Sequence, residues 1–136
     1  MMTNDSKPTP SADGLSAPYW EATTRGELSI QRCTNCDKLR HYPSVLCPHC
    51  YSSDHDWIIA SRRGQLHSWT VTHHAFHPAF AALLPYTLVT VDLEEGVRAL
   101  GLLGEGMGKS LKPGMRMQAR FQTRQDRFGD LTFDIC

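Results

Sequence analysis

The sequence predicts a mainly β protein in which a short N-terminal helix and a small metal-binding ribbon precede a barrel of five to six strands. Three observations support this fold class. Two cysteine pairs with CxxC spacing lie within residues 33–50, alternating apolar and polar residues recur from residue 65 onward, and turn residues separate the alternating segments. With 136 residues, the chain has the length of one average domain or of two very small ones.

The N-terminal part is expected to be a tail followed by a helix. Residues 1–16 are polar and rich in Pro, Ser and Asp, so they bury too little apolar surface to offset the entropy of ordering and are expected to be disordered. A short helix is predicted from Pro18, a residue suited to a first turn, to Gly26, which suits a helix end. This helix carries the adjacent aromatic residues Tyr19 and Trp20. They pack either in the protein's own core or on a partner protein.

The cysteine spacing predicts a zinc ribbon within residues 17–56, after the helix. Cys33, Cys36, Cys47 and Cys50 form two CxxC pairs separated by ten residues. Two tight turns of this kind can present four thiolates tetrahedrally, which is the ligand set of a structural zinc site, and we favour zinc over iron. Such a site has no open position for water, so the metal is expected to stabilise the fold. A redox pair would need a thioredoxin-like strand and helix, and a disulfide framework belongs in a secreted chain.

Residues 57–136 are predicted to form the barrel. The clearest alternation places Met115, Met117, Ala119 and Phe121 on one face of a strand, with polar residues on the other. Five short strands are the number found in an OB-fold. The expected strands lie at residues 57–59, 65–73, 86–93, 97–103, 115–122 and 131–135.

The charge balance disfavours nucleic-acid binding. The chain has 14 Lys and Arg and 14 Asp and Glu, a formal net charge of zero, whereas nucleic-acid binders normally carry a basic excess. Single-stranded nucleic-acid binding remains the alternative function, because zinc ribbons and OB barrels commonly bind single strands. The sequence has no apolar run near membrane-spanning length and no secretory-signal pattern. A cytoplasmic location is therefore expected.

Three histidines and a glycine-rich segment could carry chemistry, but each has a simpler interpretation. His73, His74 and His77 lie between two predicted strands and could bind metal or exchange protons, yet no carboxylate neighbours them in sequence. We favour a solvated loop. The segment 104–110 resembles a phosphate-binding loop but lacks the P-loop spacing. His41, which lies between the cysteine pairs, is expected to be exposed, as is His49.

Arginines on the last strands could meet an acidic ligand. Arg116, Arg120 and Arg124 lie on the polar side of the predicted Met115 strand and its continuation. A solvated face is the default interpretation, although three guanidinium groups could bind phosphates. The fifth cysteine, Cys136, has no indicated partner.

The order of these motifs resembles a known family. Tyr19-Trp20-Glu21, Arg25-Gly26-Glu27-Leu28, the two CxxC pairs and Lys112-Pro113-Gly114-Met115 follow one another as in the small zinc-ribbon and OB-fold proteins long catalogued as a domain of unknown function. The resemblance covers residues 18 to 135 and implies a rubredoxin-like ribbon followed by an OB barrel. The glycine that often follows each cysteine pair in the family is replaced by Asp37 and Tyr51. Tyrosine tolerates a left-handed backbone poorly, so we expect a distorted second turn with ligation preserved.

The resemblance also implies a function. Members of this family accompany thiolase-fold enzymes, so the chain is expected to be a non-catalytic, zinc-containing accessory subunit of a thiolase-type acyl-CoA complex. The reaction would be cleavage or condensation of a β-ketoacyl-CoA, or related aldol chemistry. In such a hetero-oligomer the chain would dock on its partner and help to enclose the CoA arm. Tyr19 and Trp20 are the expected partner contacts, and Arg116 and Arg120 the expected acyl-CoA contacts.

Overall fold

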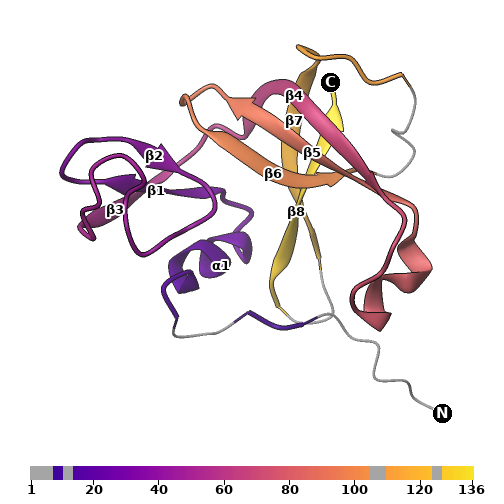
Figure 1. Ribbon diagram of the computed structural model, residues 1–136, viewed down its shortest axis with the longest axis horizontal. Helices are drawn as coiled ribbons and strands as arrows, with labels where there is room; N and C mark the ends of the chain where they lie inside the picture. Colours follow the sequence, from indigo (N-terminus) through magenta and orange to yellow (C-terminus); the bar gives the residue numbers. More distant parts are fainter. Residues whose placement is uncertain (1–7, 11–13, 105–109, 124–126) are drawn as a thin grey trace.

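The computed structural model describes residues 8–10, 14–104, 110–123 and 127–136, and these residues form a ribbon, a helix and a barrel (Figure 1). Most of the expected tail, residues 105–109 of the glycine-rich segment, and Arg124 lie outside the described residues. The elements in chain order are α1 (Ala17–Thr23), β1 (Ser29–Cys33), β2 (Leu39–Arg40), β3 (His55–Ile59), β4 (Arg63–Thr72), the 3-10 helix η1 (Pro78–Leu83), β5 (Tyr86–Leu93), β6 (Arg98–Leu103), β7 (Arg116–Thr123) and β8 (Gly129–Ile135).

The ribbon is a three-stranded antiparallel sheet with the order β2-β1-β3. Its third strand includes the segment that the sequence assigned to the start of the barrel. Trp57 of β3 pairs with Gln31 of β1, and both Trp57 and Ile58 pack against the apolar core. The predicted boundary between residues 56 and 57 therefore falls inside β3, because strand pairing extends the ribbon as far as Ile59.

The remaining five strands close into a barrel with the order β4-β5-β6-β8-β7. Closure requires two pairings between strands that are distant in sequence: β4 pairs with β7 in antiparallel orientation, and β6 pairs with β8 in parallel orientation. This arrangement is the five-stranded Greek-key barrel of the OB-fold. It confirms the predicted fold class, with five strands at the lower end of the expected range.

One apolar core joins the ribbon, the helix and the barrel. Tyr19 of α1 and Leu28 and Ile30 of the ribbon belong to the same buried cluster as the barrel residues, among which Phe133 of β8 is fully buried. A Cβ atom added at Gly101 would lie 3.0 Å from the Phe133 ring, so a glycine allows β6 to approach β8 closely. The ribbon is therefore packed on the barrel as part of one hydrophobic interior.

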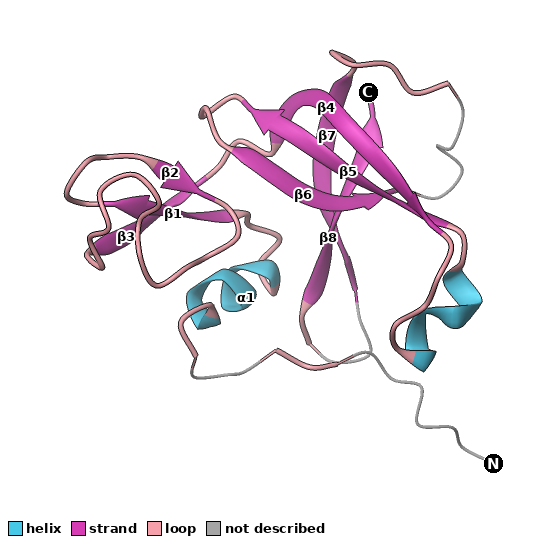
Figure 2. Cartoon of the chain, in the orientation of Figure 1, coloured by secondary structure: helices cyan, strands magenta, loops and turns pink. Residues whose placement is uncertain are grey.

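Helix α1 lies between the ribbon and β8 (Figure 2). The Thr23 side chain accepts a hydrogen bond of 3.0 Å from the Gly129 backbone N–H at the start of β8, and Glu21 forms an ion pair with Arg127. These contacts tie the helix to the barrel. Neither α1 nor η1, the helices of the described residues, has the length and apolarity to cross a bilayer.

A bulge in β4 changes which side of that strand faces outward. The register with β5 shifts between Leu66, which is buried, and Ser68. Beyond this point Trp69 pairs with the fully buried Val89, so the bulge places Trp69 and Val71 on the same face of the sheet as Leu66. Both are nevertheless exposed, at 37% and 46%. The distal part of the β4 and β5 hairpin therefore presents apolar side chains to solvent.

Candidate metal centre and ribbon–barrel junction

The two cysteine pairs lie on two turns with equivalent backbone hydrogen bonds. In the first turn the Cys33 carbonyl accepts from the Asp37 N–H at 2.9 Å, and in the second the Cys47 carbonyl accepts from the Tyr51 N–H at 2.9 Å. Both Asp37 and Tyr51 adopt the left-handed region, with φ values of 66° and 64°. The expected distortion of the second turn is absent, because Tyr51 accepts the unfavourable backbone conformation while its side chain remains exposed to solvent.

The four thiols converge as a tetrahedral metal site requires. All four Sγ atoms lie within 4.8 Å of one another, with 3.5 Å between those of Cys33 and Cys50 and 3.6 Å between those of Cys36 and Cys47. Zinc–sulfur bonds of about 2.3 Å in a tetrahedron separate the sulfurs by a little under 4 Å, so the donors fit the ion. These residues would hold Zn²⁺ with a complete set of protein ligands, which makes the site structural.

The surroundings of the site favour thiolates at Cys47 and Cys50, whereas burial and the neighbouring cysteines raise the pKa of the Cys36 thiol. Hydrogen bonds from the Asn35 side chain and the Ser52 backbone lower the pKa of the Cys50 thiol to about 6. The His49 backbone N–H donates to the Cys47 sulfur at 3.4 Å. Donors that point at sulfur stabilise its ionised form, which is the form that binds metal.

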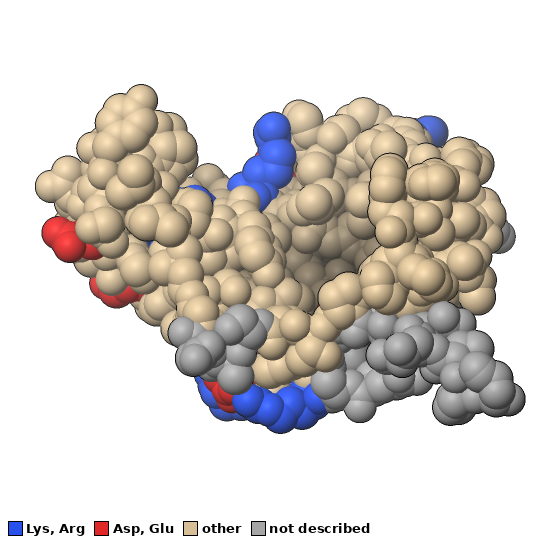
Figure 3. Space-filling view, turned by 60° about the horizontal axis from the view of Figure 1, so that its bottom comes forward, with Lys and Arg blue, Asp and Glu red and all other residues tan. Residues whose placement is uncertain are grey.

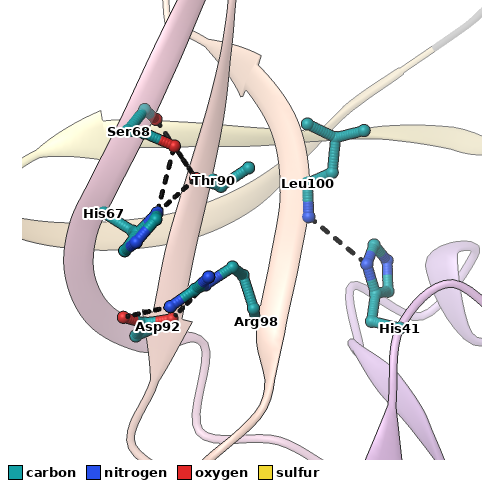
Figure 4. A network of polar contacts seen from close by, with 7 residues as sticks. All are labelled: His41, His67, Ser68, Thr90, Asp92, Arg98 and Leu100. Atoms are coloured by element: carbon teal, nitrogen blue, oxygen red, sulfur yellow. Dashed lines mark hydrogen bonds and ion pairs between the residues drawn. The ribbon is translucent and has the colours of Figure 1, made fainter.

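His41 connects the ribbon to the helix and to the barrel, contrary to the expectation that it is exposed. Its Nε2 atom lies 3.4 Å from the Tyr19 hydroxyl oxygen, and its Nδ1 atom accepts a hydrogen bond of 3.3 Å from the Leu100 backbone N–H of β6 (Figure 4). Because Nδ1 is an acceptor, the imidazole is neutral, with its proton on Nε2 facing Tyr19. Burial lowers the pKa of His41 to about 4, which agrees with this form.

We expect His41 to make stability fall as the solution becomes acidic. Its pKa is about 4 in the folded protein, against an ordinary value of 6.5. The unfolded chain therefore binds the proton more readily, so the contribution of His41 is complete above pH 6.5 and decreases as the pH falls toward 4. The decrease is on the order of 3 kcal/mol in the free energy of unfolding. Denaturant unfolding of the zinc-loaded chain across this range measures it.

The control for this prediction is His41→Gln, whose amide does not titrate. Both proteins share the acid sensitivity of the cysteine ligands, so the difference between their stability profiles isolates His41. The variant is expected to show the shallower decline below pH 6.5. Parallel profiles would contradict the burial of a neutral imidazole at this position.

A hollow is lined by residues of α1, the ribbon and the barrel, and His41 is part of its wall. Figure 3 shows a face of the molecule that is hollowed in this way. The hollow has a volume of about 300 Å³. Its lining combines aromatic residues from distant parts of the chain with aliphatic residues of the barrel; these include Trp20, Tyr42, Phe80, Tyr86, Leu100 and Leu131. The sequence did not reveal this cavity, since its walls come together only through the packing of the ribbon on the barrel.

The two aromatic residues predicted to contact a partner have different environments. Tyr19 is only 3% exposed and belongs to the core, so its side chain is unavailable to a second chain. Trp20 is partly buried and packs edge-to-face against Tyr19, Tyr42 and Phe128. Of this pair, Trp20 alone retains accessible surface.

The arginines predicted to contact acyl-CoA lie on the outer face of β7. Arg120 forms an ion pair of 2.6 Å with Asp134. Arg116 lines a separate cavity of about 570 Å³, whose wall also contains Asp92 and Glu94. Arg63 lies in the same wall and pairs with Glu94, so charges of both signs line this cavity. Contact of Arg116 and Arg120 with acyl-CoA stays a prediction.

The histidines of the loop before η1 are not gathered into a metal site. His77 accepts a hydrogen bond of 3.1 Å from the Ala79 N–H and thereby caps η1, while His73 and His74 are exposed. Within the described ranges, the cluster of four cysteines is the group of His, Cys, Asp and Glu side chains that could hold a metal ion. A solvated loop therefore remains a simpler interpretation of this segment than a metal-binding or proton-exchanging site.

Family models and known proteins match the chain over both parts of its fold. The model of the ChsH2 rubredoxin-like zinc ribbon domain matches residues 20–56, and that of the ChsH2 C-terminal OB-fold domain matches residues 57–122. The first of these models, together with the convergence of the four thiols, supports a structural zinc ion in the ribbon.

Three curated relatives share sequence with this chain. It is 44% identical over 92 residues to a probable enoyl-CoA hydratase alpha subunit of Thermomonospora curvata. It is 31% identical over 112 residues to the 3-oxo-4,17-pregnadiene-20-carboxyl-CoA hydratase alpha subunit of Mycobacterium tuberculosis, and 30% identical over 93 residues to a DUF35 domain-containing scaffold protein of Methanocaldococcus jannaschii. The matches cover 68%, 82% and 67% of this chain but only 28%, 35% and 64% of the respective relatives.

Two solved structures resemble the chain over nearly its whole length. A DUF35-family protein of unknown function from Sulfolobus solfataricus shares the fold, with a TM-score of 0.60 at 11% identity over 91% of this chain and 87% of its own. A chain of the Ltp2-ChsH2(DUF35) aldolase superposes with a TM-score of 0.76 at 34% identity, over 93% of this chain and 98% of its own. This protein is therefore a member of the ChsH2 (DUF35) family of zinc-ribbon and OB-fold proteins.

Proposed function

We propose that this chain is a non-catalytic accessory subunit of a thiolase-like acyl-CoA enzyme. The observation that carries the proposal is the match to a chain of the Ltp2-ChsH2(DUF35) aldolase over 98% of that chain. The names of two relatives point to hydratase subunits that act on CoA esters. A small chain that matches parts of several acyl-CoA enzyme complexes is suited to a role in assembly.

The chemistry of the described residues supports a role without catalysis. A site with four cysteine ligands leaves zinc no position for substrate or water. The exposed thiol of Cys136 has no histidine among the described residues that share its cavity, and the carboxylates there, Asp92 and Glu94, are held in ion pairs with Arg98 and Arg63. A nucleophilic cysteine needs a neighbouring base or another means of activation. We therefore assign the reacting groups to the partner enzyme.

The distribution of charge does not favour the nucleic-acid alternative. A protein that binds single-stranded nucleic acid holds the phosphate backbone in a positively charged groove. Here many guanidinium groups are already neutralised by carboxylates of the same chain. The pairs are Arg25 with Glu27, Arg32 with Asp56, Arg63 with Glu94, Arg98 with Asp92, Arg120 with Asp134, and Arg127 with Glu21.

The experiment compares the purified chain, a thiolase-like enzyme, and their mixture. We expect the chain alone to leave acyl-CoA unchanged, and the mixture to elute as a complex whose turnover exceeds that of the enzyme alone. Size-exclusion chromatography and an assay of free CoA measure these results. Turnover by the rigorously purified chain that disappears in His74→Ala would instead identify the histidine loop as catalytic.

Trp20→Ala tests where the partner binds. Aromatic residues often dominate interfaces, and truncation of a central one costs on the order of 2 kcal/mol, so partner affinity is expected to fall at least about tenfold. Zinc content serves as the control and should not change. If the variant melts at a lower temperature but binds the partner normally when folded, Trp20 stabilises only its own chain.

A further inference from the structure

Arg40 is a buried arginine without a carboxylate partner. It is the second residue of β2, and only 7% of its surface is exposed. Its Nη2 atom donates to the Ser44 carbonyl at 3.1 Å, but Nε and Nη1 are buried and meet no acceptor among the described residues. Arg40 also takes part in none of the ion pairs within this part of the chain. A buried charge without compensation is strongly unfavourable, so a negative charge is expected nearby.

Gln31 adds another unpaired donor at the same place. It lies opposite Arg40 in the pairing of β1 with β2, and its side chain is fully buried. The Gln31 Oε1 atom accepts from the Ser44 N–H at 2.8 Å, whereas Nε2 has no acceptor among the described residues. Side chains opposite each other on neighbouring strands share one face, with Cβ atoms about 5 Å apart. Buried N–H groups of two side chains therefore gather on one face of the ribbon, an arrangement that suits a negative charge.

The register of the ribbon places Arg40 beside the cysteine cluster. Because side chains alternate along a strand, Cys33 lies on the same face of β1 as Gln31. The Cys33 N–H donates to the Lys38 carbonyl at 2.9 Å, which continues the pairing of the two strands and makes Arg40 the diagonal neighbour of Cys33. Diagonal neighbours have Cβ atoms roughly 7 to 8 Å apart. The buried guanidinium group is thus close to the first turn of the metal site.

The zinc-loaded form of this site requires a cation. The two positive charges of zinc and the four negative charges of the thiolates leave a net charge of −2. Lys38 and Arg32 are also near the first turn in sequence, but Lys38 is exposed and Arg32 is paired with Asp56. A buried guanidinium group is screened far less by solvent than an exposed ammonium group. A neutral acceptor such as water would satisfy the N–H groups of Arg40 and leave both charges uncompensated.

We propose that Arg40 compensates the negative charge of the zinc-loaded cysteine site and thereby strengthens the affinity of the site for the ion. The four cysteines bind the metal, and Arg40 lowers the electrostatic cost of gathering four thiolates in the ribbon. The inference goes beyond the proposed function, because it requires neither a partner enzyme nor an acyl-CoA. Loss of a group that supports metal ligands from outside the coordination typically weakens metal binding about 10- to 100-fold.

The test measures the zinc affinity of the reduced full chain in competition with a chromophoric chelator. Arg40→Gln keeps a hydrogen-bond donor for the Ser44 carbonyl but removes the charge, and Arg40→Met removes both. Each variant is expected to bind zinc at least about tenfold more weakly than the unaltered chain. Arg40→Lys keeps the charge and is expected to restore the affinity.

Cobalt spectra show whether the site itself stays intact. Co²⁺ in place of zinc reports the ligands and their geometry through its absorption bands. These bands are expected to be unchanged in Arg40→Gln, because charge compensation does not alter the coordination. A purely structural role, in which Arg40 holds Ser44 and the segment that leads to Cys47, would change them. The matched control is Arg25→Gln, the same substitution at an arginine that is 57% exposed and paired with Glu27; it should leave zinc affinity unchanged.

Each outcome supports the inference or overturns it. Weaker zinc binding in Arg40→Gln and Arg40→Met, restored in Arg40→Lys and accompanied by unchanged cobalt bands, supports charge compensation. Unaltered affinity in Arg40→Gln overturns it, since the charge would then have no effect on the metal. Equal losses in all three variants, or altered cobalt bands in Arg40→Gln, also overturn it, because Arg40 would then act through the geometry of the ribbon.

Discussion

Replacing Cys47 by serine is expected to abolish zinc binding and to unfold the ribbon. Cys47 is fully buried, and its carbonyl, N–H and sulfur all take part in the second turn. The binding energy of a structural zinc ion, on the order of 10 kcal/mol or more, is folding energy for a segment with little core of its own. Elemental analysis should show a decrease from about one zinc per chain to none. Hydrogen exchange should accelerate across residues 27–59, while the barrel stays partly folded.

Cys136→Ser is the matched control. It makes the same chemical change at an exposed thiol outside the cluster, so zinc content and exchange rates are expected to remain those of the unaltered chain. Freshly purified, reduced protein that contains no metal would contradict the zinc assignment itself. Retention of zinc by Cys47→Ser would show that another group completes the coordination.

Phe133→Ala is expected to destabilise the barrel by several kcal/mol. Phe133 is fully buried, pairs with Ala119 of β7 and Leu103 of β6, and packs against Gly101. Phe→Ala substitutions in a core cost about 3 to 5 kcal/mol, because they remove apolar burial and leave a cavity. Urea denaturation of the zinc-loaded protein measures the difference in the free energy of unfolding.

The same substitution at Phe76 provides the control, because that side chain is 90% exposed. Phe76→Ala should change the free energy of unfolding by less than about 0.5 kcal/mol. Similar losses in the two variants would mean that the Phe133 environment is not the closely packed interior described above.

The metal ligands and the strand pattern could be predicted because each depends on local spacing. Two CxxC pairs in tight turns determine where four sulfurs can meet, and the alternation around Met117 determines which face of β7 enters the barrel. Turn residues such as Gly114, with a φ of 89°, mark the ends of strands. These signals can be recognised in the sequence because they do not require knowledge of distant contacts.

The contacts between the ribbon and the barrel could not be predicted, because they depend on how these two parts pack on each other. His41 lies between the cysteine pairs in a segment without regular alternation, and only the positions of Tyr19 and Leu100 explain its neutral state. The pairing of Trp57 with Gln31 likewise follows from sheet formation with β1. An alternating segment alone does not show which of two sheets it joins.

Because the ribbon, the helix and the barrel share one core, the stability of the barrel depends on the concentration of free zinc. Leu28 and Ile30 cover barrel residues only while β1 is held in place, and zinc binding to the folded ribbon favours that state by mass action. Barrel stability must therefore rise with free zinc concentration, although the four ligands all belong to the ribbon. In a cell short of zinc, this thermodynamic linkage would expose apolar surface of the barrel and so reduce the amount of folded protein.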